Sequence, residues 1–423
     1  MAQVDLSGRE PQAPLRTADG TPLKAALARA SRRAQWQALA LVLPLLLFIL
    51  ASFVLPIGQM LYRSVANPAF SANMPTLVAW FAANPPGTEP DEAAFAAMVA
   101  DLGVAAEQRT VGLVGTRINY EVPGTRSMFT SAGRRAAKLE PPFREAMLEL
   151  DPGWAGPELW SAMRGAAAGH TPNFYIAALD RKVAAEGGIV RVDPEQRIYL
   201  PLFWRTMFLS AVIAALCLLL GFPIAHLLAT LPLRYSNLLM ILVLLPFWTS
   251  LLVRTTSWMV LLQSEGVINN ALVYLGVISD DGRLAMMYNR VGTIVAMTHI
   301  LLPFMVLPLY SVMRTINPSY VRAARSLGAT SWTAFRRIYL PQTVPGIGAG
   351  ILLVFILAVG YYITPALVGG SSGQLFSNMI AFHMQKSLNW SLAAALAAIL
   401  LGAVLLLYWL YDRLIGIDNM KLG

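Results

Sequence analysis

Residues 317–346 read NPSYVRAARSLGATSWTAFRRIYLPQTVPG, a polar and basic segment between two hydrophobic runs. Asn317 can accept the first free N–H groups of a helix and Pro318 suits its first turn, so a helix is expected to begin there. Gly328 is expected to end it, because the residue after a helix often needs a positive φ. A second helix should follow and stop before Pro341. The segment is therefore predicted to be a helix-turn-helix at a membrane surface.

Two interpretations of this segment compete. A basic amphipathic connector that lies on lipid headgroups explains its arginines and aromatic residues. A docking element for another protein explains in addition the small side chains of Ala323 and Ala324, which would let a partner's groove close tightly around the segment. The residues alone leave both interpretations open.

The spacing within the segment resembles the EAA loop of ABC-importer permease subunits. That pattern is E-A-A, three residues, G, nine residues, then I-x-L-P, and the chain keeps the spacing throughout while placing Arg322 where the family has glutamate. The resemblance implies that a separate ATPase couples to this loop. The residues to which it assigns ATPase coupling are Arg322, Ala323, Ala324, Gly328, Ile338, Leu340 and Pro341.

The composition is that of a polytopic membrane protein. Of the 423 residues, 56% are hydrophobic and 13% are charged, and the apolar residues form blocks long enough to cross a bilayer. The net charge of +9 does not indicate nucleic-acid binding, because the basic residues gather in the N-terminal tail and in the segment above, as cytoplasmic loops do. Cys217 is the only cysteine, so no intrachain disulfide is possible.

Alternating apolar and polar regions predict an all-α protein with six transmembrane helices. A longer polar region between the first two helices predicts a small soluble domain that is α/β or mostly α. A cleaved signal peptide is the alternative to the first helix, but its apolar run is longer than such signals have. The predicted order is a cytoplasmic tail (1–35), the first transmembrane helix (36–62), a periplasmic insert (63–200), a permease core (201–413) with a cytoplasmic loop (314–345), and a cytoplasmic C-terminal tail (414–423).

The charges support this topology. The 314–345 loop holds five arginines and no acidic residue, whereas Glu265, Asp280 and Asp281 fall on the opposite side of the membrane. The core spans after the insert are expected at about 202–231, 237–263, 291–313, 346–365 and 389–411.

A solute pathway is expected where polar and aromatic groups interrupt the apolar helices. Arg254 follows apolar residues in the third span, where it either snorkels to the interface or faces a pathway. The sequence GYYITP, residues 360–365, predicts a helix break that presents aromatic and hydroxyl groups. His299 stands alone and is interpreted as structural. The candidate pathway residues are Trp248, Arg254, Trp258, Tyr361, Tyr362 and Thr364.

The sequence lacks the motifs of an energy-converting or catalytic chain. It contains no G-x-x-x-x-G-K-[ST] phosphate loop, the predicted spans hold no H-E-x-x-H or G-x-S-x-G motif, and the insert shows no metal-ligand spacing. The chain is thus expected not to be an enzyme, to hold no cofactor and to leave ATP to a partner subunit. A secondary carrier is disfavoured by the scarcity of intramembrane carboxylates, and a membrane enzyme by the missing motifs.

Three further stretches, residues 242–272, 299–313 and 360–370, resemble permeases of the spermidine/putrescine type in the binding-protein-dependent type I importer family. The resemblance covers about residues 36–62 and 200–413 and leaves the insert unexplained. It implies a bacterial inner membrane protein that works with a second homologous permease subunit, a cytoplasmic ABC ATPase dimer, a periplasmic solute-binding protein and membrane lipids. The implied solute is a polyamine, with an opine or amino-acid derivative left open.

Overall fold

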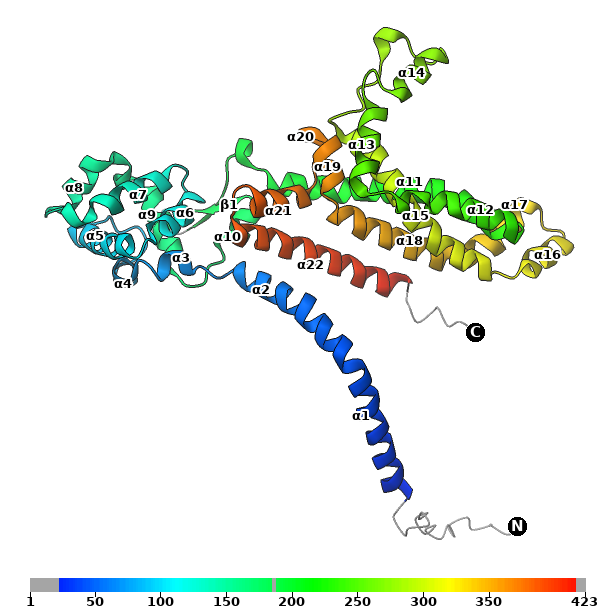
Figure 1. The fold of residues 1–423 in the computed structure, drawn as a ribbon, viewed down its shortest axis with the longest axis horizontal. Helices are drawn as coiled ribbons and strands as arrows, with labels where there is room; N and C mark the ends of the chain where they lie inside the picture. The colour runs from blue at the N-terminus through cyan, green and yellow to red at the C-terminus, as the bar shows by residue number, and fades with distance from the viewer. Residues whose placement is uncertain (1–22, 185–187, 416–423) are drawn as a thin grey trace, which may run out of the picture. The chain divides into compact units, whose positions relative to one another are not determined.

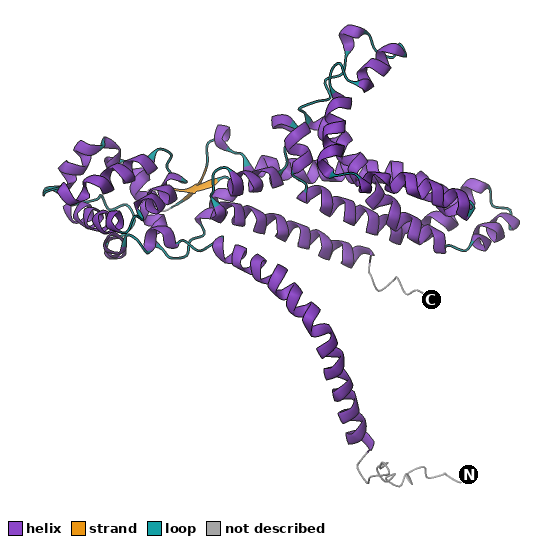
Figure 2. Cartoon of the chain, in the orientation of Figure 1, coloured by secondary structure: helices purple, strands orange, loops and turns teal. Residues whose placement is uncertain are grey.

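The structure is a computed structural model that describes residues 23–184 and 188–415. Most of the two predicted terminal tails lies outside these residues. The chain divides into two units, residues 1–62 and 63–423. The described parts of both are almost entirely helical, with one short β-hairpin in the second (Figures 1 and 2). The expected mostly helical, polytopic membrane protein is confirmed.

The described part of the first unit is one long apolar helix. It consists of α1 (Leu23–Ile49), a π-helical turn (Leu50–Val54) and α2 (Leu55–Arg63). Pro56 lacks an N–H donor, and just before it the N–H of Leu55 bonds to the carbonyl of Leu50, five residues back, so the helix widens there instead of breaking. The Ser31–Arg63 stretch, with a hydropathy of 2.9, is long and apolar enough to cross a bilayer.

The second unit begins with the insert, a mostly helical domain. Large, fully buried side chains form its core, among them Phe95, Phe129 and Trp154. Its hairpin pairs antiparallel strands with Lys182 opposite Val190. The elements are α3 (Pro68–Ser71), α4 (Pro75–Ala83), α5 (Glu92–Glu107), α6 (Val111–Asn119), α7 (Thr125–Arg135), α8 (Phe143–Leu150), α9 (Pro157–Ala167), α10 (Asn173–Ala178), β1 (Arg181–Val183) and β2 (Ile189–Arg191), with 3-10 turns at Ala136–Lys138, Pro152–Ala155 and Pro194–Gln196.

Three long helices pack side by side in the membrane part of this unit, and a fourth joins them (Figure 1). Two glycines allow the three to approach closely around Met305. A Cβ atom at Gly350 would lie 2.6 Å from the Met305 sulfur, and one at Gly221 would lie 3.1 Å from its Cγ. The three helices are α11 (Tyr199–Thr230), α15 (Arg290–Thr315) and α18 (Leu340–Gly360), and the fourth is α22 (Trp390–Ile415).

The third predicted span, residues 237–263, is bent and not one straight helix. The chain turns by 97° at the two-residue break between its helices. Pro246 lacks an N–H donor, and Ser250 starts a new helix by accepting the N–H of Val253 at 3.2 Å. The described residues hold five candidate spans, or up to six if this bent pair counts as one. Its elements are α12 (Leu233–Leu244), a 3-10 turn (Leu245–Trp248), α13 (Leu251–Leu262) and α14 (Val267–Tyr274).

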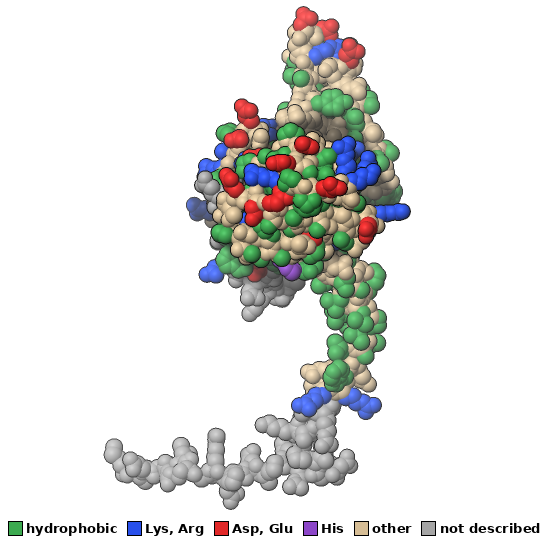
Figure 3. All heavy atoms as spheres, turned by 90° about the vertical axis from the view of Figure 1, so that its left-hand side faces the viewer, with side chains coloured by type: hydrophobic (Ala, Val, Ile, Leu, Met, Phe, Trp, Pro, Cys, Tyr) green, Lys and Arg blue, Asp and Glu red, His purple; other side chains and the backbone are tan. Residues whose placement is uncertain are grey.

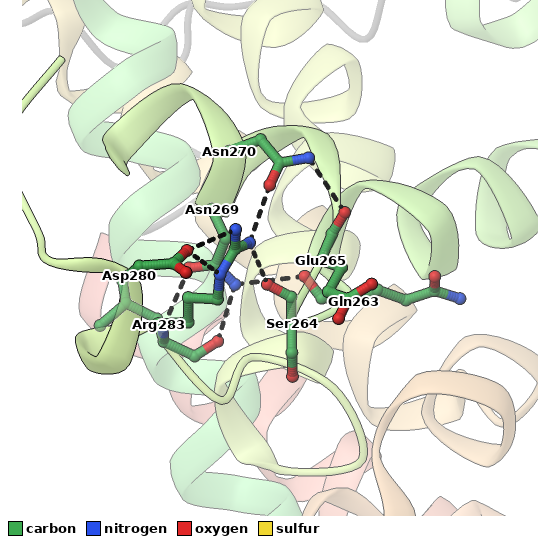
Figure 4. Close-up of polar contacts among 8 residues, drawn as sticks. Gln263, Ser264, Glu265, Asn269, Asn270, Asp280 and Arg283 are labelled. Atoms are coloured by element: carbon green, nitrogen blue, oxygen red, sulfur yellow. Dashed lines mark hydrogen bonds and ion pairs between the residues drawn. The ribbon is translucent and has the colours of Figure 1, made fainter. Parts of the chain in front are cut away.

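Polar side chains fix the segment that follows α13. Arg283 donates hydrogen bonds to Asp280 at 3.0 Å, to Asn270 at 2.7 Å and to the carbonyl of Ser264 at 2.9 Å (Figure 4). The buried side chain of Asn269 bonds to backbone groups on both sides of this network. The segment therefore has a defined conformation without a large apolar core of its own.

The insert and the membrane helices share contacts at the start of α11 and along α22. The carboxylate of Asp180, in the insert, accepts the N–H groups of residues 198–200 at 2.7–3.1 Å and so caps α11. Phe174 of α10 packs in a common apolar cluster with residues of α22. The hydroxyl of Tyr120 donates to the carbonyl of Leu388 at 3.0 Å. The two parts are thus held together by packing and by hydrogen bonds.

Candidate functional site

The EAA-like segment begins as its sequence predicts. Helix α16 (Pro318–Ser326) starts at Asn317, whose side chain accepts the N–H of Ser319 at 2.9 Å. It ends at Gly328, which has a φ of +90° and donates its N–H to the carbonyl of Arg325 at 3.0 Å. The predicted helix and its glycine bend are confirmed.

The second helix of the segment does not stop before Pro341, so that expectation is wrong. It starts at Thr330, whose hydroxyl accepts the N–H of Thr333 at 3.2 Å, and runs without interruption through α17, a π-helical turn and α18 to Gly360. As before Pro56, a leucine precedes the proline, and its N–H bonds five residues back, to Phe335. The elements before α18 are α17 (Ser331–Ala334) and the π-helical turn Phe335–Tyr339.

Contacts with the end of α11 hold this helix in place. The hydroxyl of Tyr339 lies 3.0 Å from Nδ1 of His226, and the ring of Phe335 stands edge-on to the same imidazole with centroids 6.1 Å apart. Arg314, at the end of α15, donates to the carbonyl of Ala229 at 3.1 Å. The segment is thus held on the end of α11, and α11 is in turn bonded to the end of α15.

The tip of the segment presents apolar side chains among arginines. Leu327 is 90% exposed and Trp332 is 68% exposed, although each is large and apolar. An apolar tip with guanidinium groups around it can bind a protein groove or anionic lipid headgroups. Of the residues predicted to couple to an ATPase, Arg322, Ala323, Gly328 and Pro341 are exposed, and Ala324, Ile338 and Leu340 are partly buried.

The helix break predicted within residues 360–365 is present at the other end of this continuous helix. The hydroxyl of Ser377 donates to the carbonyl of Tyr361, and the amide of Asn378 donates to that of Tyr362 at 2.8 Å. Buried carbonyls freed by a break need such donors. The break is followed by α19 (Ile363–Val368), α20 (Gly370–Gly373) and α21 (Phe376–Gln385), and α21 supplies both donors.

Thr364 meets the bent third span beside this break. Its hydroxyl lies 3.1 Å from that of Thr255 in α13, and both side chains are fully buried. One turn further along α13, the indole N–H of Trp258 donates to Nδ1 of His299 at 3.0 Å. Hydrogen bonds therefore join α13 to both α19 and α15.

Arg254 lies in the same group. Its Nε atom is buried and has no hydrogen-bond partner among the described residues. Its charge acts on both His299 and Tyr361. A buried donor without a partner is costly, so this atom can donate to a group from outside the described residues.

The structure brings together four of the six candidate pathway residues, namely Arg254, Trp258, Tyr361 and Thr364. Trp248 is 80% exposed on its 3-10 turn and makes none of these hydrogen bonds. Tyr362 contributes its backbone carbonyl, which accepts a hydrogen bond from Asn378. Sequence reasoning missed Ser377 and Asn378, whereas the hydrogen bond of His299 to Trp258 agrees with its interpretation as a structural residue. Two adjacent polar residues about 15 positions after a predicted helix break could have indicated Ser377 and Asn378, because a broken helix leaves carbonyl groups that need hydrogen-bond donors.

The chemistry of these groups is that of binding. Within the described ranges no three His, Cys, Asp or Glu side chains come close enough to hold a metal ion. Aromatic faces, hydroxyls and one guanidinium group can hold a small solute by stacking, hydrogen bonding and charge.

The chain is similar to several known transport permeases. The Spermidine/putrescine transport system permease protein PotB of Escherichia coli (strain K12) is 38% identical over 256 residues, which cover 58% of this chain and 92% of that protein. PotB of Haemophilus influenzae is 35% identical over 224 residues, 53% of this chain and 78% of that protein. The Escherichia coli inner membrane ABC transporter permease protein YdcU is 31% identical over 230 residues, which cover 51% of this chain and 72% of that protein.

A solved bacterial alginate ABC transporter, in complex with its alginate-bound periplasmic protein, is 20% identical to the chain with a TM-score of 0.42, over 55% of this chain and 85% of that one. Residues 198–415 match the family described as "Binding-protein-dependent transport system inner membrane component". The match begins where the insert ends and takes in the EAA-like segment, the break after Gly360 and α22. The chain therefore belongs to this family of inner membrane transport components, and it is a permease of an ABC importer and not an enzyme.

Proposed function

We propose that the chain forms, together with a second homologous permease subunit, the solute pathway of an ATP-driven importer. A cytoplasmic ABC ATPase dimer docks on residues 317–346, and a periplasmic solute-binding protein delivers the solute. The observation that carries the proposal is the continuous helix Ser331–Gly360. It begins at the proposed docking turn and ends where Tyr361 and Thr364 meet α13.

The proposed mechanism uses this helix as the mechanical link. ATP binding closes the ATPase dimer, the EAA-like segments move with it, and the spans change from an inward-facing to an outward-facing state. A ligand shifts such an equilibrium only through its differential affinity for the two states, so the closed ATPase dimer must favour the outward-facing form. Arg322 gives the contact a positive charge where the family pattern has a negative one.

The proposed topology follows the distribution of charge. The 314–345 loop and both termini lie in the cytoplasm, and the insert lies in the periplasm. The five arginines of the loop and its lack of acidic residues support this orientation.

The proposed solute is a polyamine. The support is the similarity to PotB proteins, together with the aromatic side chains beside the break, which suit a flexible polycation. A second candidate, an opine or amino-acid derivative, is favoured by one observation. The partnerless Nε of Arg254 suits a carboxylate and repels a polycation.

Co-purification tests the docking proposal. Ala323→Trp places a bulky side chain on the exposed face of α16 and should abolish recovery of the ATPase with the permease from membranes. Ala271→Trp, at an exposed alanine of α14, is the matched control and should leave recovery unchanged. Equal recovery with both variants, or solute uptake that continues without any ATPase, would overturn the proposal.

Uptake tests the solute. Membrane vesicles that contain the assembled importer should take up labelled spermidine or putrescine in an ATP-dependent way. If octopine or another amino-acid derivative competes and an excess of spermidine does not, the second candidate replaces the first. In that case Arg254→Gln should raise the half-saturating concentration of the competing solute.

A further inference from the structure

The insert contains a hollow that neither the permease pathway nor the EAA-like segment uses. Its volume is about 310 Å³, within the size range of small-molecule sites. It is enclosed by parts of α4, α5, α8 and α9 and by the loop between α4 and α5. The lining residues that bear on ligand binding are the aromatic and charged ones Trp80, Phe81, Trp160, Glu89, Arg144 and Arg164. We call it the aromatic–arginine pocket.

Three packed rings form one wall of the pocket. The ring of Trp160 stands edge-to-face against those of Trp80 and Phe81, with centroids 6.1 Å apart in each case. The two indole N–H groups are already used: Trp80 donates to Asp91 at 3.0 Å, and Trp160 to the carbonyl of Trp154 at 2.8 Å. Phe81 and Trp160 are each only 6% exposed, so most of the ring surface that this wall offers a ligand belongs to Trp80, and it suits a flat apolar body.

Arg164 is fixed beside this wall. Its Nη1 donates to the carbonyls of Phe81 at 3.0 Å and Asn84 at 2.6 Å, and its guanidinium carbon lies 4.8 Å from the Phe81 ring centroid. Within the described chain, its Nε and Nη2 have no hydrogen-bond partner. Burial lowers the pKa of Arg164 from its ordinary value, but a guanidinium group stays protonated at neutral pH. The pocket thus holds a positioned cation with free donors.

The charges of the lining favour an anion. The lining includes two guanidinium groups, those of Arg144 and Arg164, and one carboxylate, that of Glu89. Arg164 already lies over the rings of Phe81 and Trp80, 4.8 Å and 6.0 Å from their centroids, so its positive charge disfavours a second cation at these rings. Figure 3 looks onto the insert and shows acidic and basic side chains interspersed over its surface. The preference for an anion is therefore local to the pocket.

We propose that the aromatic–arginine pocket binds a small organic carboxylate with a flat apolar body. The carboxylate takes the free donors of Arg164 and the charge of Arg144, and the flat body packs on Trp80 and on the exposed edges of Phe81 and Trp160. The site is separate from the transport pathway and does not depend on which solute the pathway carries.

Three probes that share one ring separate charge from shape: phenylacetate, its neutral amide phenylacetamide, and the cation phenethylamine. Binding to the full-length protein in lipid nanodiscs is measured by titration calorimetry. Phenylacetate should bind at least tenfold more tightly than the amide, and phenethylamine should not bind. The proposal is overturned if phenethylamine or putrescine binds and phenylacetate does not, or if no probe binds.

Variants locate the site. Arg164→Met should weaken phenylacetate binding at least tenfold, and Ser161→Phe should abolish it by filling the pocket. Arg164 also supports the α4 loop, so Arg144→Gln, at an exposed side chain, is the variant that keeps the fold and should weaken binding severalfold. Arg134→Gln, at an exposed arginine of α7 outside the pocket, is the control and should bind like wild type. Unchanged binding in both Arg144→Gln and Ser161→Phe would place the probe elsewhere and refute the assignment.

Discussion

Gly328 shows how one residue sets the geometry of the EAA-like segment. Its φ of +90° lies in a region that side chains with a Cβ rarely adopt. A Cβ atom at this position would meet no other atom within 4 Å. The glycine is therefore required by its backbone conformation and not by lack of space.

Replacing Gly328 by valine should strain this bend by about 1–3 kcal/mol and reorient α16. We expect normal membrane insertion and assembly but a severalfold lower transport rate per ATP hydrolysed, measured in proteoliposomes. Gly402→Val, at a helical glycine in open space, is the control and should transport normally. A wild-type transport rate in Gly328→Val with normal assembly would show that the bend does not matter for coupling.

Asn378 has a comparable role at the break after Gly360. It donates to the carbonyl of Tyr362 and accepts the N–H of Leu375 at 2.9 Å. Asn378→Leu keeps the side-chain volume but leaves both backbone groups without a partner, at a cost of about 1–3 kcal/mol each. The thermal unfolding temperature should fall. Ser371→Ala, at an exposed position, should leave it unchanged, and equal temperatures in the two variants would contradict this account.

Among the secondary-structure elements, the helix from Ser331 to Gly360 carries most of the proposed function. It crosses Pro341 through a π-helical turn, in which the N–H of Leu340 bonds five residues back to Phe335, so the helix widens at the proline and does not end there. Its middle packs on α15 and α11, and its two ends carry the two candidate sites.

Weakening this helix between its ends should uncouple them. In Ile351→Gly combined with Leu353→Gly, two partly exposed positions lose helix propensity at about 1 kcal/mol each. We expect ATP hydrolysis by the assembled complex to continue while solute uptake falls, which raises the ratio of ATP hydrolysed to solute moved. Leu405→Gly combined with Leu406→Gly, in α22, is the control and should leave that ratio unchanged. An unchanged ratio in the α18 variant would argue against this helix as the mechanical link.

The elements that depend only on interactions between neighbouring residues could be predicted from the sequence. The cap at Asn317 and the turn at Gly328 depend on a few adjacent residues, and both are where the sequence places them. Pro341 was misjudged because the general effect of proline is to end a helix, and only the π-helical turn avoids it. The contacts of Thr364 with Thr255 and of Trp258 with His299 join segments far apart in sequence, and no spacing rule reports them.

The second unit as a whole behaves as one folded piece, because the insert and α22 share an apolar cluster. Phe174 is 5% exposed and packs there with Leu392 and Leu396. Phe174→Ala should cost about 3–5 kcal/mol and raise hydrogen exchange in both α10 and α22. Phe129→Ala, inside the separate core of the insert, should raise exchange in the insert alone. Unchanged exchange in α22 after Phe174→Ala would show that the cluster does not couple the two parts.

The proposed topology can be tested with introduced cysteines. Cys217 is fully buried and should not react, so the natural chain is a suitable background. A membrane-impermeant maleimide applied to intact cells with a permeable outer membrane should label Ser127→Cys, in the insert. It should label Ser326→Cys, in α16, only after the inner membrane is opened. The reverse pattern would invert the orientation of the chain.

The unbroken run from Ser331 to Gly360 contains 30 residues, which makes it about 45 Å long at 1.5 Å per residue. A tilt of only about 5° around its first turn displaces the far end by roughly 4 Å, from the same rise per residue. That distance exceeds the length of a hydrogen bond, so the carbonyls of Tyr361 and Tyr362 could not keep both donors on α21 through such a swing unless α21 travels too. If the helix tilts in this way, α21 must move with it. Otherwise the hydrogen bonds from α21 to the carbonyls of Tyr361 and Tyr362 must break and re-form in every transport cycle.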